Sequence, residues 1–479
     1  MTTTINYKQF ASPFSWRYGS SEMRTIWSEV HKRRTWRKIW VELARAQMRV
    51  GLVKPEQVTD LEKHVDEIDM ARAEVIEARI HHDLMAEVHT YAEQSPLGGG
   101  IIHLGATSMD IEDNADALRI RDSLDLILDG MQTLLETLSD QIERLADHPT
   151  MAFTHIQPAE PTTMGYRLAL YAQDLLEDDL MLRQLRASIR GKGFKGAVGT
   201  SASYAELLEG TGTTPGELET WVMEALDLPA YPIAGQTYTR KQDWQVLTAL
   251  SGIAGSLYKF AFDLRLLQSP VIGEWGEPFG SHQVGSSAMP FKRNPINAEK
   301  LDSLGRLIAS LVEVAWNNHA HSLLERTLDD SANRREILPV AFLATDEMLK
   351  VAQRILAELR VDNDAAARNL ERYGTFAAIE RILMQAAKAG ADRQQLHEHL
   401  REQSMAAWHA ISRGQPNPLA DLLSHSETLN QYLSPDQIRA LLDASTYVGD
   451  APERARQFAQ LILDHLKDER NAARTPQRL

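Results

Sequence analysis

The chain has 479 residues, 43% hydrophobic and 24% charged, which is globular composition and long enough for two or three domains. Its net charge of -15 disfavours nucleic acid as a partner, and the absence of cysteine excludes disulfides, thiol nucleophiles and thiolate zinc sites. No stretch has the unbroken apolar length of a bilayer span, and the opening MTTTINYKQF lacks the pattern of a secretory leader. We therefore expect no membrane partner and a cytoplasmic location.

Helical periodicity dominates the chain. Residues 20–92 have the pattern of helices with polar breaks, and a segment rich in Pro and Gly interrupts them from Gln94. From Met109 to His148 apolar residues recur every three or four positions, which predicts one very long amphipathic helix that ends before Pro149. The same periodicity predicts four more helices, each far longer than the mean of about 11 residues: Thr162–Arg190, Arg240–Gln268, Ile296–Glu325 and roughly Arg335–Leu359.

Five such helices indicate a central bundle. Strand signals are sparse and confined to short runs such as AYPIAG (230–235), so a parallel sheet has nothing to be built from. Near Val361–Asp364 we expect the long helices to give way to shorter ones. The sequence thus predicts an all-α fold of three domains: an N-terminal helical domain over 1–107, a central long-helix bundle over 108–361 and a C-terminal helical domain over 362–479.

The segment GKGFKG (Gly191–Gly196) has the glycine spacing of a dinucleotide-binding loop. It follows a predicted helix rather than a strand, and no βαβ unit surrounds it, so a dinucleotide site is not expected there. We interpret the segment as the end of a helix, with Lys192 and Lys195 in a solvated basic turn.

The segment GSSAMPFKRNP (Gly285–Pro295) lies between two predicted long helices. An exposed connector is the ordinary interpretation of such a segment. A connector, however, has no need for Lys292 and Asn294 close to Ser286. An ammonium, an amide and free backbone N–H groups together suit an anion, so we interpret the segment as a loop that closes over a carboxylate.

A second cluster, FTHIQPAEPTT (Phe153–Thr163), falls in the bend between the first two long helices. His155 is its only group that titrates near neutral pH. A lone histidine is more often structural, but this one lies beside Thr154 and close to the expected start of a helix, where the helix dipole and hydroxyls favour a bound anion. We therefore favour a functional role for His155.

A third cluster combines HHDLMAEVH, with His82 and His89 on one expected helical face, and IIHLGATS, in which His103 precedes Thr107 and Ser108. Metal binding is the alternative. Because H-E-x-x-H and cysteine are both absent, we expect no metal and favour anion contacts and acid–base support.

The fourth cluster, ERTLDDSANRR (Glu325–Arg335), supplies two arginine forks and a hydroxyl that suit a phosphate monoester. A surface ion-pair network with Asp329 and Asp330 explains the same residues equally well. The residues alone leave both alternatives open.

GSSAMPFKRNP resembles the signature of the fumarase/aspartase superfamily, and FTHIQPAEPTT, GQTYTRK and ERTLDDSANRR together resemble the adenylosuccinate lyase family, especially its animal-type form. The similarity extends over nearly the whole chain. It implies a small-molecule substrate, no cofactor, and a homotetramer with active sites built from three chains. The implied reaction is the reversible elimination of fumarate from adenylosuccinate, giving AMP, and from the succinyl-carboxamide intermediate of purine synthesis (SAICAR), giving its carboxamide (AICAR).

The resemblance also implies residue roles. Elimination creates an aci-carboxylate with nearly two negative charges, so cations and donors must converge on it. Ser286 is the implied general base, Lys292 the stabilising cation and His155 the general acid, and His82 is implied as acid–base support. Implied substrate contacts are Asp83, His103, Thr107, Ser108, Thr154, Gln236 and Asn294, with Arg17, Tyr18, Arg326, Ser331 and Arg335 toward the nucleotide and its phosphate. His81 and Lys300 stand where animal-type relatives are expected to have arginine.

Chain geometry gives a separate expectation about assembly. The helix expected from Met109 to His148 is about 60 Å long at ~1.5 Å per residue, and six residues beyond Pro149 reach back at most roughly 20 Å. Thr107 and His155 therefore cannot meet within one chain. A site that uses both must be shared between subunits.

Two alternatives to this function remain. Another fumarate-releasing lyase, such as argininosuccinate lyase, is disfavoured by the arginine-rich fourth cluster, because a small amino acid needs no phosphate contacts. A catalytically silent helical scaffold is disfavoured because it would not need Ser286, Lys292 and His155 in its interhelical bends.

Overall fold

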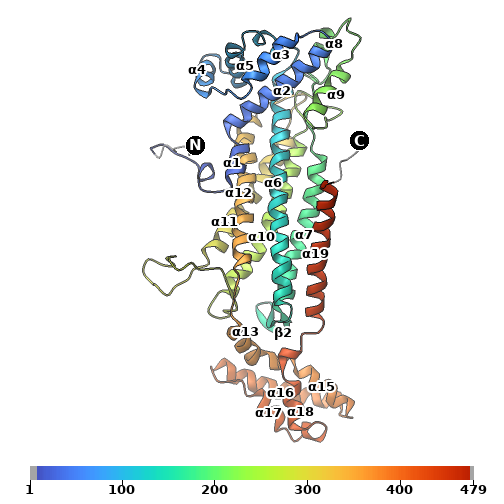
Figure 1. Cartoon of the computed structure of the whole chain (residues 1–479). Coiled ribbons are helices and arrows are strands. Elements are labelled where there is room, and N and C mark those ends of the chain that lie inside the picture. The colour runs from blue at the N-terminus through green and yellow to red at the C-terminus, as the bar shows by residue number, and fades with distance from the viewer. Residues whose placement is uncertain (1–7, 475–479) are drawn as a thin grey trace. The chain divides into compact units, whose positions relative to one another are not determined.

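The structure, a computed structural model, describes residues 8–474. Residues 1–7, the first part of the segment considered for a leader, and residues 475–479 lie outside it. The described chain is helical apart from loops and two small two-stranded sheets (Figure 1), which confirms the all-α prediction. None of the described helices is long and apolar enough to cross a membrane.

Five long helices begin and end within five residues of their predicted bounds: α6 (Ser108–Leu145), α7 (Met164–Ser188), α10 (Lys241–Leu267), α11 (Ile296–Ala320) and α12 (Ser331–Ala357). Helix α6 forms because its apolar side chains repeat with the helical period. All seven positions of that predicted face are fully buried: Leu124, Ile127, Met131, Leu134, Leu138, Ile142 and Leu145.

The long helices pack on one another through small and aromatic residues. Gly130 of α6 faces Leu349 of α12, where an added Cβ would lie 3.1 Å from the leucine side chain. Tyr171 of α7 packs edge-to-face on Phe260 of α10, with ring centroids 5.5 Å apart. These contacts identify the predicted bundle.

Shorter helices precede, separate and follow the long helices along the chain. Before α6 lie α1 (Ser21–Ile26), α2 (Glu29–Arg49), α3 (Pro55–His64), α4 (Met70–Ile80) and α5 (Asp83–Gln94), and between α7 and α10 lie α8 (Ala202–Leu207) and α9 (Pro215–Ala225). After α12 follow α13 (Asn363–Asn369), α14 (Thr375–Ala377), α15 (Ile379–Lys388), α16 (Arg393–Ser412), α17 (Leu419–Ser424) and α18 (Pro435–Leu441). Short 3₁₀ or π segments cover Pro13–Ser15, Gly99–Ile101, Leu370–Gly374, Leu429–Gln431 and Ala444–Thr446.

The last helix departs from the expectation of short C-terminal helices. Helix α19 (Ala451–Arg474) has 24 residues and packs against α6, where the Ser139 hydroxyl donates to the Ala459 carbonyl at 3.0 Å. Its buried residues Ala455, Ala459, Ile462 and Leu466 repeat with the helical period. The expectation missed this helix because its many charges lower its overall hydrophobicity without disturbing that period.

The described chain divides into two compact units. Of the described residues, the first unit contains 8–130, 178–255 and 304–350, and the second contains 131–177, 256–303 and 351–474. Within the second unit, α15 to α18 enclose an apolar core of their own. The division into three domains at 107 and 361 stays a prediction.

The sheets lie where no strand was predicted. Strands β1 (Pro149–Thr154) and β2 (Gln157–Thr163) form an antiparallel hairpin in which Thr154 pairs with Gln157, and β3 (Trp275–Gly276) pairs with β4 (Arg360–Val361). AYPIAG forms no strand, since only its Ala230 makes an isolated bridge, to Gly191. FTHIQPAEPTT is therefore a hairpin rather than a simple bend.

Candidate functional site

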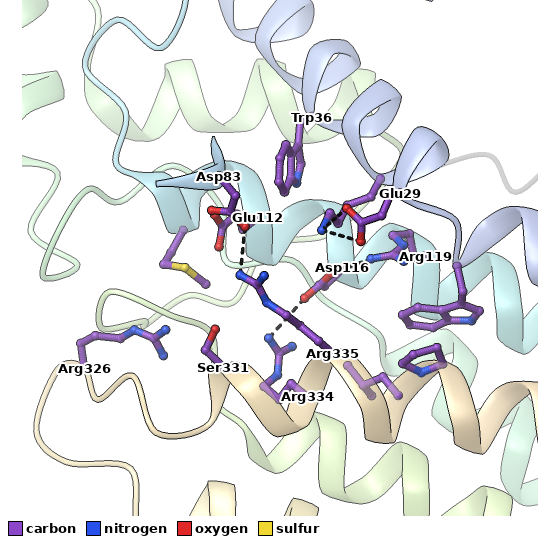
Figure 2. Close-up of a pocket in the computed structure, with 15 residues that line it drawn as sticks. Glu29, Trp36, Asp83, Glu112, Asp116, Arg119, Arg326, Ser331, Arg334 and Arg335 are labelled. Carbon is purple, nitrogen blue, oxygen red and sulfur yellow. Dashed lines mark hydrogen bonds and ion pairs between the residues drawn. The ribbon is translucent and has the colours of Figure 1, made fainter. Parts of the chain in front are cut away.

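An arginine-lined pocket in the first unit contains four of the predicted site residues: Asp83, Arg326, Ser331 and Arg335 (Figure 2). It has a volume of about 90 Å³ and is built by α2, α5, α6 and α12 together with the loop that precedes α12. This is room for a few water molecules or a small anionic group.

The arginines of this pocket are held in place by carboxylates. Arg335 contacts Asp83 at 2.9 Å, and Arg334 contacts Asp116 at 3.2 Å. Burial alone would raise the pKa of Asp83, but Arg335 and a backbone N–H hold it below its usual value. The guanidinium groups are therefore oriented before any ligand arrives, which suits recognition of an anion.

A buried ion-pair network lies next to the pocket and includes part of GQTYTRK. Arg240 contacts Asp113 at 3.0 Å and Asp330 at 2.6 Å, and Arg334 contacts Asp243 at 2.7 Å. All five side chains are at most 7% exposed. Burial would raise the pKa of Asp330, but the two arginines hold it below its usual range. The network fixes the beginning of α12, which is the part of the helix that contains Arg334 and Arg335.

These contacts answer the alternative left open for the fourth cluster. Arg326 does contact Asp330, at 2.9 Å, but Asp330 is buried, whereas Asp329 accepts only the Thr327 hydroxyl among the described residues. The ion-pair network exists, but it is not the surface network considered from the sequence. Arg326 lines the pocket and also joins the network through its contact with Asp330.

A second carboxyl group beside Asp83 was missed in the sequence. Glu112 lines the pocket from α6, and burial, followed by the charges of Asp83 and Asp116, raises its pKa to about 8. The signal that could have found it is helical spacing, since Ser108, Glu112 and Asp116 lie four residues apart on one face of α6.

His82 and Ser108 are brought together. The His82 Nε2 lies 3.4 Å from the Ser108 hydroxyl, and His82 Nδ1 accepts from the Met85 N–H at the start of α5. His82 therefore caps α5 rather than lying within it, and the expectation that His82 and His89 share a helical face is wrong. The left-handed conformation of His81, with φ 56°, separates α4 from α5.

His103 is fixed by a buried tryptophan. The Trp40 indole N–H donates to His103 Nδ1 at 3.1 Å. Burial lowers the pKa of His103 to about 4. At neutral pH the ring is therefore uncharged with its proton on Nε2, which makes it a hydrogen-bond donor rather than a cation.

Thr107 is fixed by a buried carboxylate. Its backbone N–H donates to Asp110 at 3.1 Å, and Asp110 also contacts Lys192 at 2.5 Å and accepts from Tyr204 at 3.1 Å. Lys192 is fully buried, and Lys195 contacts Glu219 at 2.7 Å. The prediction of a solvated basic turn at GKGFKG is therefore wrong. Both lysines neutralise carboxylates from other parts of the chain.

Like His103, Thr107 and Ser108, three more predicted contacts of the first unit are not among the residues that line the pocket. Arg17 lies over the Trp16 ring at 5.8 Å, and the Tyr18 ring packs on Phe14 at 5.5 Å, both in the segment before α1. The Gln236 backbone N–H donates to the Glu325 carbonyl at 2.9 Å, which places it near the start of the fourth cluster.

In the second unit, the signature loop Gly285–Pro295 is folded on itself. The Ser286 Oγ accepts from the N–H groups of Met289 at 3.1 Å and Ala288 at 3.4 Å, and the Asn294 amide donates to the Gly285 carbonyl at 3.2 Å. Gly285 is required, because a Cβ there would lie 2.1 Å from the Lys292 carbonyl oxygen. The Lys292 side chain is exposed.

His155 lies at the tip of the β1–β2 hairpin. His155 and Ile156 form its two-residue turn with φ 53° and 59°, and Thr154 and His155 are exposed. Helix α7 begins only at Met164, so the helix-dipole argument for an anion at His155 is wrong. Positive φ at two residues that are not glycine, one of them β-branched, is unusual and marks a constrained turn.

The base of this hairpin is anchored by Glu274, which is fully buried. Its carboxylate accepts from the Thr150 hydroxyl at 2.6 Å, from Arg167 at 3.1 Å and from the Asn369 amide at 3.0 Å. The hairpin therefore presents an exposed imidazole from a rigid base.

Comparison with known proteins gives the family. Residues 8–309 match the family model described as "Lyase", and residues 376–458 match that described as "Adenylosuccinate lyase C-terminus". The chain is 38% identical to adenylosuccinate lyase of Schizosaccharomyces pombe over 463 residues, covering 95% of this chain and 94% of the relative. It belongs to the adenylosuccinate lyase family. The enzyme of Saccharomyces cerevisiae is also 38% identical, over 95% of each chain.

A solved structure shares the fold of this chain. The crystal structure of a fumarate lyase from Mesorhizobium sp. BNC1 matches with a TM-score of 0.81 at 22% identity, covering 94% of this chain and 99% of the other. The chain is thus a fumarate-releasing lyase of the adenylosuccinate lyase family, as the sequence motifs predict, and the scaffold alternative is excluded.

Proposed function

We propose that the enzyme eliminates fumarate from adenylosuccinate, giving AMP, and from the succinyl-carboxamide ribotide of purine biosynthesis, giving the carboxamide. The arginine-lined pocket carries this proposal, because Arg326, Arg335 and Ser331 converge there and a phosphorylated substrate needs such a site. Argininosuccinate has no phosphate and would leave these arginines without a ligand.

Ser286 is the proposed general base. It removes a proton from the succinyl carbon beside a carboxylate, and the electron pair left behind forms the aci-carboxylate. The Met289 and Ala288 N–H groups already donate to Ser286 Oγ, and they favour its alkoxide form. Lys292 on the same loop supplies a positive charge for the developing dianion, once the loop has closed and excluded water.

His155 is the proposed general acid. The bond between carbon and nitrogen breaks as the double bond of fumarate forms, and the imidazolium gives its proton to the departing nitrogen. Thr154, Thr107, Ser108, Gln236 and Asn294 are the proposed succinyl contacts, with His82 and His103 in support, and Arg17, Tyr18 and Asp83 complete the nucleotide contacts. The Asn294 amide has two N–H donors, so one can take that role while the other donates to the Gly285 carbonyl.

We also propose a homotetramer with shared active sites. Helix α6 supports this, because its 38 residues hold its two ends about 57 Å apart at ~1.5 Å per residue, with Thr107 preceding one end and the His155 hairpin following the other. Chains from different subunits would bring these groups together. The cytoplasmic location and the lack of a metal or cofactor stay predictions.

The decisive experiment mixes the purified protein with adenylosuccinate and follows AMP and fumarate by absorbance. Turnover supports the proposal, whereas turnover of argininosuccinate in its place would contradict it. Shared sites have a separate test: after subunit exchange, a mixture of inactive His155→Ala and inactive Ser286→Ala protein should regain some activity. No recovery after verified exchange would argue for sites within one chain.

A further inference from the structure

Glu112 differs from every other acidic residue that lines the arginine pocket. It extends into the pocket from α6 beside Asp83 and faces Arg335 of α12 (Figure 2). Asp83 contacts Arg335 at 2.9 Å, Asp116 contacts Arg334 at 3.2 Å, and Glu29 contacts Lys32 at 2.6 Å. Within residues 8–474, the Glu112 side chain has no such cation and no hydrogen bond.

The charges around Glu112 explain why it has no ion-pair partner. Asp83 approaches from α5, Asp113 and Asp116 from its own helix, and Arg335 from α12. Arg334 of α12 and Lys32 of α2 line the same pocket, but each is already held by another carboxylate. An ionised Glu112 would add a further negative charge next to other carboxylates, and these carboxylates already form ion pairs with the nearby basic side chains.

The protonated acid fits this position better. Burial and the acidic neighbours raise the pKa of Glu112 to about 8, while Arg335 holds the pKa of Asp83 below its usual value. Two adjacent carboxyl groups with opposite shifts take different roles. Asp83 remains a carboxylate that positions Arg335, and Glu112 is a neutral acid with an O–H to donate.

We infer that the Glu112 carboxylic acid donates a hydrogen bond to the phosphate of the bound nucleotide, and that its ionisation weakens phosphate binding. This inference rests on the proposed function, because it assumes that the arginine pocket takes the phosphate. A phosphate dianion offers only acceptors, so a protonated carboxyl adds a donor, whereas a carboxylate would repel the dianion.

The test is the dissociation constant of AMP measured by calorimetry between pH 7 and pH 9.5. Phosphate is already a dianion in this range, because its second pKa is near ~6. The wild-type dissociation constant should rise at least about fivefold as Glu112 ionises. Glu112→Gln, which keeps the shape and a donor without titrating, should bind AMP within about threefold of wild type at pH 7 and lose the rise.

Control proteins make the result specific. Glu29→Gln removes a carboxylate of the same pocket that is already paired with Lys32, and should keep the wild-type rise. Glu112→Ala should show a flat profile with binding about threefold to tenfold weaker at pH 7, and it replaces Glu112→Gln if that protein fails to fold. The dissociation constant of adenosine, which lacks the phosphate, should have the same pH profile in wild type and in the Glu112 variants.

Each remaining outcome contradicts the inference. It is wrong if wild type shows no rise, if the rise persists in Glu112→Gln, or if AMP does not bind at all. Turnover of adenylosuccinate by the same preparations at pH 7 separates the two proposals. If the preparations turn over adenylosuccinate but the AMP dissociation constants of wild type and Glu112→Gln have the same pH profile, only the role of Glu112 is contradicted. If there is no turnover, the proposed function is contradicted.

Discussion

The arginine pocket and the signature loop are built in opposite ways. In the pocket, Arg334 and Arg335 are oriented by carboxylates, and the network behind them is buried. In the loop, Ser286 and Asn294 bond only to backbone groups of the loop itself among the described residues, and Lys292 is exposed. The groups proposed to bind the nucleotide are therefore preorganised, whereas those proposed for the chemistry depend on loop closure.

The largest expected effect comes from the loop. Ser286→Ala should lower kcat by about 10²–10⁴-fold, the usual contribution of a positioned acid or base. The melting temperature should stay within about 1 °C of wild type, because the Ser286 side chain makes no hydrogen bond outside its loop among the described residues.

Ser287→Ala is the matched control, since Ser287 is the neighbouring exposed serine of the same loop. It should keep kcat within tenfold of wild type. Equal losses in the two variants would mean that the loop needs its hydroxyls for folding rather than for proton transfer, and the contrast with the pocket would fail.

The next effect comes from the buried network, and it is on stability. Arg240→Met leaves Asp113 and Asp330 buried without their shared cation, which should lower the free energy of unfolding by about 3–5 kcal/mol. Urea unfolding measures this change.

Arg456→Met provides the comparison, because within the described part of the chain Arg456 makes only exposed ion pairs, such as that with Glu143 at 3.2 Å. Its loss should cost much less than the loss of Arg240, because exposed ion pairs contribute little to stability. If Arg240→Met costs no more than that, the pocket is not held by its network.

The same contrast explains what the sequence could predict. The long helices follow from local periodicity, which is why α6 lies almost where Met109–His148 was expected. The hairpin was missed because its strands contain Pro158 and Pro161 and its turn uses His155 and Ile156 instead of Asn-Gly. Tertiary contacts overcome those unfavourable preferences, notably the anchoring of the hairpin base by Glu274.

Residues with long-range partners were the least predictable. Lys192 has the sequence context of a solvated turn, and only Asp110, 82 positions earlier, explains its burial. The motifs did indicate Arg326, Ser331 and Arg335, because their residue types suit phosphate. Glu112 follows Ser108 by one helical turn, but an acidic residue at that spacing is ordinary on a solvated helix.

A smaller effect is expected on the histidine fixed by tryptophan. Trp40→Phe keeps an aromatic ring but removes the N–H that donates to His103 Nδ1. The His103 ring is then free to change tautomer, and kcat/KM for adenylosuccinate should fall about twofold to tenfold, the usual weight of one hydrogen bond. Nitrogen NMR of the ring should show a mixed tautomer, and Trp221→Phe, on α9, should change neither measurement.

The smallest expected effect is the pH dependence of stability due to His103. Burial lowers its folded pKa to about 4 from the model-peptide value near 6.5, so between these values the unfolded chain binds more protons than the folded one. The stability associated with the neutral ring is therefore complete above about pH 6.5 and decreases as the pH falls toward 4.

His103→Asn removes this titration, and asparagine tolerates the observed φ of 69°. Between pH 7 and pH 5, urea unfolding should show wild type losing about 1 kcal/mol more than the variant, less than the full shift implies because the ring is partly exposed. Parallel pH profiles would mean that the ring is protonated as easily as in solution, and that the Trp40 contact does not keep Nδ1 free of its proton.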